Sequence, residues 1–195
     1  MARPKKRATY EDLCALPEGT RAELMGGEIV TLPAPMPRHL SVRRALGRFV
    51  GGPFDDDDGY GGPGGWWLFP ECDVRLGENV VRPDMAGWRR ERLPSPDVRP
   101  IDVVPDWICE VVSPSNEAYD RVTKRRLYAA SGVAFYWIVD TEARTLEAYE
   151  LRDARWVEVG TYDENDLARI APFEAVELPI ARLFLPPHNV ADAGT

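Results

Sequence analysis

The run PDWICEVVSPSNEAYDRVTKRRLYAASGVAFYWIVD, residues 105–140, decides which fold this sequence adopts. An apolar strand is expected at 106–112, a helix over about 117–131, and a second apolar strand at 134–140 after the helix-ending Gly132. Strands that alternate with a helix are typical of layered proteins in which helices cover a sheet. We therefore expect an α/β or α+β fold, with a sheet flanked by helices.

The sequence on both sides of this run adds further elements to the expected sheet and its helices. Residues 21–30, RAELMGGEIV, predict a hairpin that turns at Gly26-Gly27, a favoured two-residue turn. A short capped helix begins after Thr9, and a longer helix is expected over 38–50. The remaining strands are expected at 66–76, 80–86, 145–151 and 155–162.

The bulk composition bounds the class of protein. The 195 residues, 44% hydrophobic and 29% charged, suit one domain over 9–185, with a basic leader at 1–8 and a loose tail at 186–195. Neither a membrane-length apolar run nor a secretory signal is present, so we expect a cytoplasmic protein. The net charge of -8 opposes nucleic-acid binding, which would have to rely on local basic clusters and a bound metal.

The cysteine and histidine content limits the kind of metal site. Three scattered cysteines and two histidines do not supply a structural zinc site. Any metal should therefore be a hard cation held by carboxylates. The four aspartates at 55–58 lie on a glycine-rich loop, where a solvated charged run is the preferred interpretation.

Two carboxylates stand in successive apolar strands. Glu110 lies inside WICEVV, where an unpaired charge would be costly to bury. Asp84 follows Pro83, which marks an edge or a bend because proline cannot donate to a β-ladder. If the two strands are neighbours, the carboxylates come close enough to share one cation, and at least one of them should have a raised pKa without it. The alternatives are a salt-bridged Glu110 and an ordinary turn at Asp84.

Lys124 shares one helix stripe with apolar residues. Asp120, Lys124, Leu127 and Tyr128 fall at helical spacing, so the stem of Lys124 should lie on the packed side and its amine should reach the carboxylates. The alternative is an Asp120–Lys124 surface pair worth a few tenths of a kcal/mol.

These residues resemble a known family. The segment RPDMAGW, the run 105–140 and RAELMGGEIV followed by His39 are similar to the Uma-type group of endonuclease-like proteins in the PD-(D/E)XK superfamily. The resemblance spans about residues 10–159 and implies a restriction-endonuclease-like core with a mixed sheet and an added hairpin near each end. The segment AELMGG departs modestly from the family, which more often has an aromatic before the glutamate and an aspartate before the glycine.

The resemblance also implies site residues. Asp84 and Glu110 correspond to the motif acids, while Lys124 takes the place of the lysine usually found two residues after Glu110, where this chain has Val112. Glu23 and His39 match further family positions, although a hairpin surface glutamate and a core histidine are the competing interpretations. The resemblance also implies a bound metal ion, Mg²⁺ with Mn²⁺ as a substitute. Its expected ligands are Asp84, Glu110 and the backbone carbonyl of Val111.

The implied reaction is hydrolysis of phosphodiester bonds by an endonuclease, in DNA by family analogy alone, with Lys124 orienting or deprotonating the attacking water. A homodimer is expected only on the ground that cutting two strands needs two centres. Six basic residues from two helices are expected to form a rim around the site: Arg38, Arg43, Arg44, Lys124, Arg125 and Arg126. The alternatives are a catalytically silent nucleic-acid-binding or scaffold protein and a two-carboxylate sugar hydrolase that needs no metal.

Overall fold

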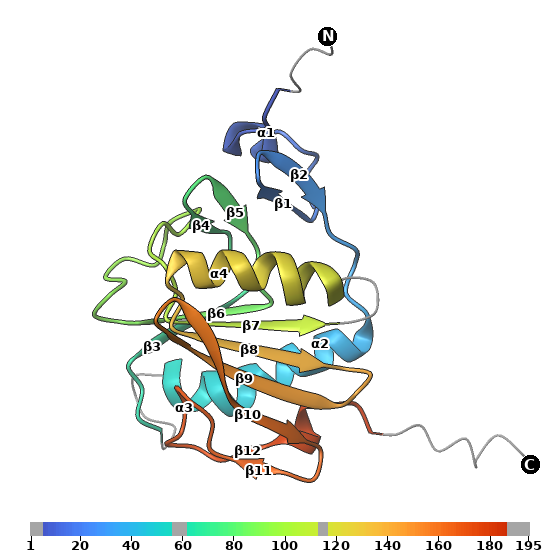
Figure 1. The fold of residues 1–195 in the computed structure, drawn as a ribbon, viewed down its shortest axis with the longest axis vertical. Coiled ribbons are helices and arrows are strands. Elements are labelled where there is room, and N and C mark those ends of the chain that lie inside the picture. Colours follow the sequence, from blue (N-terminus) through green and yellow to red (C-terminus); the bar gives the residue numbers. More distant parts are fainter. Residues whose placement is uncertain (1–5, 56–61, 113–116, 187–195) are drawn as a thin grey trace, which may run out of the picture.

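The computed structural model describes residues 6–55, 62–112 and 117–186, and its centre is a mixed β-sheet (Figure 1). The strand order is β10-β9-β8-β7-β6-β3, with β7 and β8 parallel and the other pairs antiparallel. A parallel pair needs a long crossover, which the helical segment between β7 and β8 provides. The strands are β3 (Trp66–Pro70), β6 (Met85–Arg89), β7 (Trp107–Val112), β8 (Phe135–Asp140), β9 (Thr145–Arg152) and β10 (Arg155–Asp163).

A second, antiparallel sheet lies beside the first, in the order β2-β1-β5-β4. Its strands are β1 (Ala22–Met25), β2 (Glu28–Thr31), β4 (Val74–Leu76) and β5 (Asn79–Val81), with helix α1 (Tyr10–Cys14) beside β1. The predicted hairpin at Gly26-Gly27 is confirmed, and both glycines have the positive φ that this two-residue turn requires. The short strands β11 (Leu167–Ala168) and β12 (Leu178–Pro179) pair near the C-terminus, before η3 (Ile180–Leu183).

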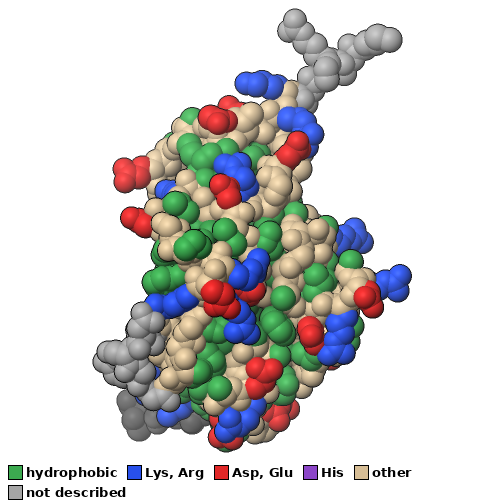
Figure 2. Space-filling view, turned by 90° about the vertical axis from the view of Figure 1, so that its left-hand side faces the viewer, with side chains coloured by type: hydrophobic (Ala, Val, Ile, Leu, Met, Phe, Trp, Pro, Cys, Tyr) green, Lys and Arg blue, Asp and Glu red, His purple; other side chains and the backbone are tan. Residues whose placement is uncertain are grey.

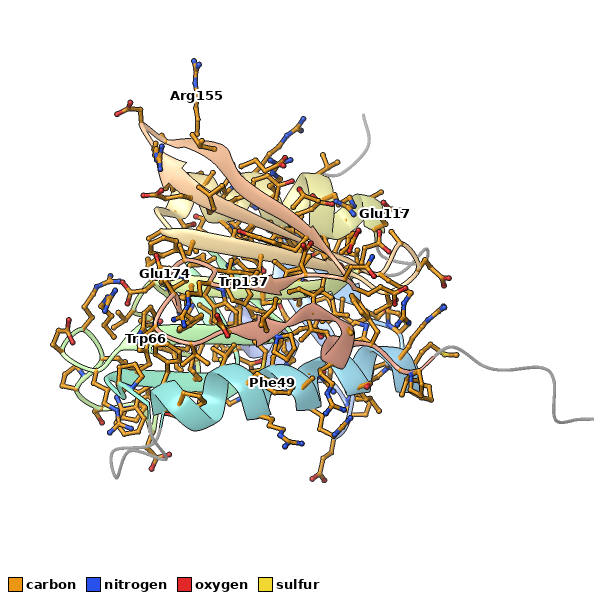
Figure 3. All side chains as sticks on the ribbon, turned by 90° about the horizontal axis from the view of Figure 1, so that it is seen from below. Phe49, Trp66, Glu117, Trp137, Arg155 and Glu174 are labelled. Atoms are coloured by element: carbon orange, nitrogen blue, oxygen red, sulfur yellow. The ribbon has the colours of Figure 1, made fainter. Side chains whose placement is uncertain are left out.

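Helices cover both faces of the six-stranded sheet. On one face lie α2 (Pro37–Leu46), the π-helical turn η1 (Gly47–Gly51) and α3 (Gly52–Asp55). On the other lie η2 (Tyr119–Lys124) and α4 (Arg125–Ser131). Figure 3 shows α2 running beneath the sheet, with Trp137 above it. The expected α/β class, a mixed sheet flanked by helices, is therefore confirmed.

Strand β7 is buried along its whole length, and its side chains alternate between the two cores. Trp107, Cys109 and Val111 pack on the α2 side, whereas Ile108 and Val112 pack on the α4 side. Glu110 therefore points to the α4 side, between two apolar neighbours on its own strand. The apolar run that is so prominent in the sequence reflects a strand covered on both faces.

Several expected boundaries differ from the structure. The strand expected over 66–76 breaks at Glu71, whose φ is +47°, into β3 and β4. The strand expected over 80–86 divides around Pro83 into β5 and β6, so the bend inferred from this proline is present. The helix expected over 38–50 continues through η1 and α3 to Asp55.

The two expected ends of the domain lie partly outside the described residues. Of the leader at 1–8, Arg7 donates to the carbonyl of Gly26 and pairs with Glu78, while the Ala8 amide donates to Gly27. Residues 1–5, most of the tail expected at 186–195 and three of the four aspartates at 55–58 are outside the described part. In the described ranges, none of the helices has the length and apolar character needed to cross a bilayer.

Candidate active site

The register of β6 and β7 brings the two predicted carboxylates together. Met85 of β6 pairs with Cys109 of β7, and the two strands are antiparallel. The residue before Met85, Asp84, therefore lies beside the residue after Cys109, Glu110. Both residues are buried, with exposed fractions of 6% and 2%. Asp84 lies where the chain leaves the small sheet and enters the large one, directly after Pro83. The site is therefore at the junction of the two sheets.

Asp84 is held by partners from two other elements. Its Oδ1 lies 2.6 Å from His39 Nε2 on α2, and its Oδ2 accepts the backbone N–H of Val111 at 2.8 Å. Burial raises the pKa of Asp84, but the hydrogen bond and charge of His39, the Val111 N–H and Lys124 together hold that pKa below its ordinary value. Asp84 is therefore kept as a carboxylate, with both oxygens oriented.

Lys124 lies at the centre of a buried cluster of three carboxylates. Its Nζ is 2.9 Å from Glu23 Oε1, 3.0 Å from Glu110 Oε1 and 3.4 Å from Asp120 Oδ1. All four side chains are at most 3% exposed. The expectation that Lys124 faces the packed side of its helix, with its amine toward the carboxylates, matches this geometry. The alternative of a surface Asp120–Lys124 pair does not.

Neighbouring groups fix the positions of Glu23 and Glu110. Glu23 comes from β1, and its Oε1 accepts the backbone N–H of Arg82 at 2.7 Å, while its Oε2 accepts the Tyr119 hydroxyl at 2.8 Å. Glu110 Oε1 accepts the Tyr128 hydroxyl at 2.5 Å as well as the Lys124 ammonium. Glu23 is thus a buried member of the cluster, not a surface residue of the hairpin.

The charges in the cluster shift one another's protonation. Burial raises the pKa of Glu110 well above its ordinary value, opposed by Lys124 and assisted by the surrounding carboxylates. Burial also raises the pKa of Asp120, to about 6. These shifts match the expectation that clustered carboxylates titrate high.

The pKa of Lys124 is controlled by its neighbouring charges, which together outweigh its burial. Burial lowers its pKa, but Glu110, Glu23 and Asp120 together raise that pKa well above its usual range. Lys124 is therefore held as an ammonium. This environment favours orienting the attacking water over deprotonating it, because an ammonium has no free electron pair to accept a proton.

A cleft opens onto the cluster. Its volume is about 60 Å³, and its wall includes His39, Asp84, Glu110, Asp120 and Lys124. The segment 32–36 and two residues that sequence reasoning did not assign to the site, Arg21 and Arg82, complete much of the remaining wall. The five side chains expected at the site are thus brought together: Asp84, Glu110 and Lys124 with His39 line the cleft, and Glu23 lies behind Lys124.

The metal ligands expected at this cleft are oxygen atoms, the kind of ligand that a hard divalent cation prefers. Across the described ranges, no group of three or more His, Cys, Asp or Glu side chains has metal-binding geometry. The expected set contains only two carboxylates, Asp84 and Glu110, plus the Val111 carbonyl. Because the N–H and C=O of one strand residue point to the same side, that carbonyl faces the Asp84 side of β7. Mg²⁺ binds through one or two carboxylates and keeps several waters, so this donor set suits it.

The expected rim of six basic residues is wrong in part. Lys124 and Arg38 line the cleft, and Arg43 Nη1 lies 2.6 Å from Glu71 Oε1 and 3.9 Å from Asp84 Oδ1. Arg44, in contrast, lies in a separate hollow with Arg48 and Arg182, and Arg125 and Arg126 line another surface with Trp156. Helical rotation separates these side chains, since consecutive residues point about 100° apart. Figure 2 shows basic and acidic side chains interspersed on the face that it presents.

Sequence reasoning did not assign four further groups of the cluster to the site: Asp120, Tyr119, Tyr128 and the backbone N–H of Arg82. The sequence pattern indicates Asp120 only as the partner of Lys124 and Tyr128 only as a core residue. Tyr119 drew no attention, although it lies five residues before Lys124 on the same helical segment. Helical spacing placed Asp120 and Tyr128 on the stripe of Lys124, so that signal was available. Arg82 carried none, because its contact with Glu23 is made through its backbone.

The comparisons with known proteins agree with this fold. A solved structure from Anabaena variabilis, described as a "putative nuclease belonging to DUF820", superposes with a TM-score of 0.67 and 19% sequence identity, over 90% of this chain and 97% of that one. At this identity the likeness supports the fold alone. The comparison with curated proteins gave no match.

The class of protein comes from the match to a family model, whose description is that of a nuclease. The sequence matches the Uma2 family, described as "Putative restriction endonuclease", over residues 7–181, and the chain belongs to this family. The resemblance to the Uma-type group is thus confirmed.

Proposed function

We propose that this protein is a metal-dependent endonuclease that hydrolyses phosphodiester bonds in DNA. One observation carries the proposal: the buried Lys124 ammonium lies 3.0 Å from Glu110 Oε1, and the strand register places Asp84 beside Glu110. Two carboxylates on neighbouring strands and a cation from the covering helix form a charge arrangement suited to binding a metal ion and a phosphate together. The family description supports the nuclease class.

Mg²⁺, or Mn²⁺ in its place, would be held by Asp84, Glu110 and the carbonyl of Val111. When bound, the ion would polarise the phosphate and lower the pKa of a coordinated water. The contact with His39 and the Val111 N–H lower the pKa of Asp84 and hold both of its oxygens in place. Tyr128 and Lys124 fix one oxygen of Glu110 and leave its other oxygen for the ion.

The remaining cationic groups of the cleft act on the phosphate. The Lys124 ammonium offsets negative charge that develops on the phosphoryl oxygens, and in a buried site this effect is stronger than in water. Arg38 lines the cleft, and its buried Nε has no hydrogen-bond partner among the described residues. A phosphate oxygen would supply the missing acceptor. Arg21 and Arg82 add positive charge to the same wall.

DNA is proposed as the polymer because the family description is that of a restriction endonuclease. Cutting both strands of a duplex requires two centres, so we also propose that two copies act together. The competing proposal is a protein of this fold that binds nucleic acid without cleaving it, and the net charge of -8 is the observation that favours it.

The test is a cleavage assay on DNA and on RNA with Mg²⁺ or Mn²⁺, and again with excess EDTA. Wild type should cleave DNA only when the metal is present, and Lys124→Met should be slower by about 10²-fold or more, since removal of one charge-stabilising group has an effect of that size. Lys6→Met is the matched control, because Lys6 lies outside the cleft. Cleavage that persists in EDTA, or binding of DNA without cleavage, would contradict the proposal.

A further inference from the structure

One carboxylate oxygen in the cleft is buried and unpaired. Asp120 is 1% exposed and lines the cleft, and its Oδ2 has no hydrogen-bond partner among the described residues. The neighbouring carboxylates are engaged: both oxygens of Glu23 and both oxygens of Asp84 accept hydrogen bonds. A buried acceptor without a donor is unfavourable unless another molecule supplies that donor. A water or a ligand hydroxyl in the cleft would satisfy it.

The reaction needs a proton acceptor, and several groups already assigned to the site have other contacts or roles. The Lys124 ammonium is surrounded by three carboxylates and cannot accept a proton. His39 Nε2 lies 2.6 Å from Asp84 Oδ1, which leaves only His39 Nδ1 as an alternative acceptor, and the His39→Gln variant below tests that alternative. Asp84 and Glu110 are the expected metal ligands. Asp120 is left with an oxygen that is free to accept, and Lys124 on the adjacent turn of the same helical segment anchors its other oxygen.

We propose that Asp120 Oδ2 binds the attacking water and takes its proton, a role that rests on the proposed nuclease function. In this step one O–H bond of the water breaks and its proton moves to Oδ2. The water oxygen forms a bond to phosphorus, and the bond from phosphorus to the leaving nucleotide oxygen breaks, with the electron pair remaining on that oxygen. The leaving oxygen takes a proton from solvent, and Asp120 later returns its own proton to solvent.

The electrostatic surroundings of Asp120 suit this role. Asp84 and Glu23 from β1 add negative charge around it, and Lys124 on its own helical segment opposes them. Glu110 from β7 also interacts electrostatically with Asp120, and the Tyr136 hydroxyl from β8 donates to the Asp120 backbone carbonyl. Burial is the largest contribution, and the result is a pKa of about 6 for Asp120. A general base works best when its pKa lies near the working pH. A bound cation would lower this value, because nearby positive charge favours the carboxylate.

The test compares Asp120→Asn with wild type in single-turnover cleavage of a DNA substrate across pH 4.5–8.5 with Mg²⁺. Wild type should lose activity toward acid with a midpoint at or somewhat below about 6, as a single base must be ionised. Asp120→Asn should cleave about 10²- to 10⁴-fold more slowly, the usual contribution of a general base, and should lack this acidic limb. Asp97→Asn makes the same chemical change at an exposed position and should behave as wild type.

Further readouts separate this role from others. Asp120→Asn should remain folded and should keep the increase in melting temperature that Mg²⁺ causes, because the proposal does not make Asp120 a metal ligand. Loss of that increase would make Asp120 a ligand and overturn the proposal. An acidic limb that disappears in His39→Gln but persists in Asp120→Asn would transfer the role to His39. Asp120→Asn cleavage within tenfold of wild type refutes the role of Asp120 alone, whereas a wild type that cleaves no nucleic acid refutes the nuclease function and this role with it.

Discussion

Replacing Lys124 by Met should strongly destabilise the protein at neutral pH. Methionine preserves the apolar stem but removes the ammonium, so Glu23, Glu110 and Asp120 would remain buried at most 2% exposed with no cation among them. Removing one partner of a buried ion pair costs about 3–5 kcal/mol. For a domain of this size that corresponds to a fall in melting temperature of about 6–20 °C. Calorimetry or urea unfolding at pH 7.5 measures it.

The loss of stability caused by Lys124→Met should also depend on pH, and the charges of the cluster fix the direction of that dependence. Without Lys124, the pKa values of Glu110 and Asp120 in the folded state rise further above their unfolded values. Between those values the native state binds more protons than the unfolded state, so the stability of Lys124→Met falls as pH rises. Lys124 in wild type is charged throughout this range. The difference in the free energy of unfolding between the two proteins should therefore be smaller at pH 5 than at pH 7.5.

The matched control is Arg126→Met, which removes a cation from an exposed position two residues along the same helical segment. It should change the free energy of unfolding by less than about 0.5 kcal/mol, as surface substitutions usually do. A cost below about 1 kcal/mol for Lys124→Met, or an equal cost at both pH values, would refute the buried three-carboxylate cluster around this lysine.

Three further predictions concern metal, acid and salt. Mg²⁺ should raise the melting temperature of wild type, and Glu110→Gln should lose most of that increase in thermal-shift measurements; an undiminished increase would place the ion elsewhere. Asp84 has a lowered pKa, so its contribution to stability is present above the unfolded value of about 3.9 and is lost as pH falls through the folded value. Asp84→Asn should accordingly flatten the loss of stability in acid unfolding, and an unchanged slope would argue against the His39 contact. Arg21→Ala combined with Arg38→Ala should weaken DNA binding and reduce the slope of log K against log salt by about 2, whereas Arg126→Ala should not.

Much of the fold was accessible from the sequence because its signals were local. The alternating cores of β7, the glycine turn between β1 and β2, and the helix before Gly132 follow from side-chain periodicity and backbone preferences. The break at Glu71 was not predictable, since a non-glycine residue with positive φ carries no compositional mark. The split around Pro83 was predictable in part. The proline indicated a bend in the chain, but it did not indicate that the segments before and after it belong to different sheets.

The candidate site was predictable to the extent that it depends on strands and one helix stripe. Asp84, Glu110 and Lys124 lie together, and the chemical roles assigned to them stay predictions. The family resemblance, and not periodicity, pointed to Glu23 and His39. The arginine rim failed because a count of basic residues on a helix says nothing about which direction each side chain takes. Arg21 and Arg82 line the cleft because of the tertiary structure, and the local sequence pattern around them does not indicate this position.

The most direct test of the metal-dependent nuclease is the single-turnover rate of DNA cleavage in Mn²⁺ by Glu110→Gln and Glu117→Gln. The two substitutions make the same chemical change, one at a buried residue of the cleft and the other at an exposed residue at the start of the following helix. The proposed function predicts that Glu110→Gln lowers the rate by at least about 10²-fold, the scale expected when a charge-stabilising group is lost, while Glu117→Gln cleaves like wild type. Equal rates for the two variants would contradict it.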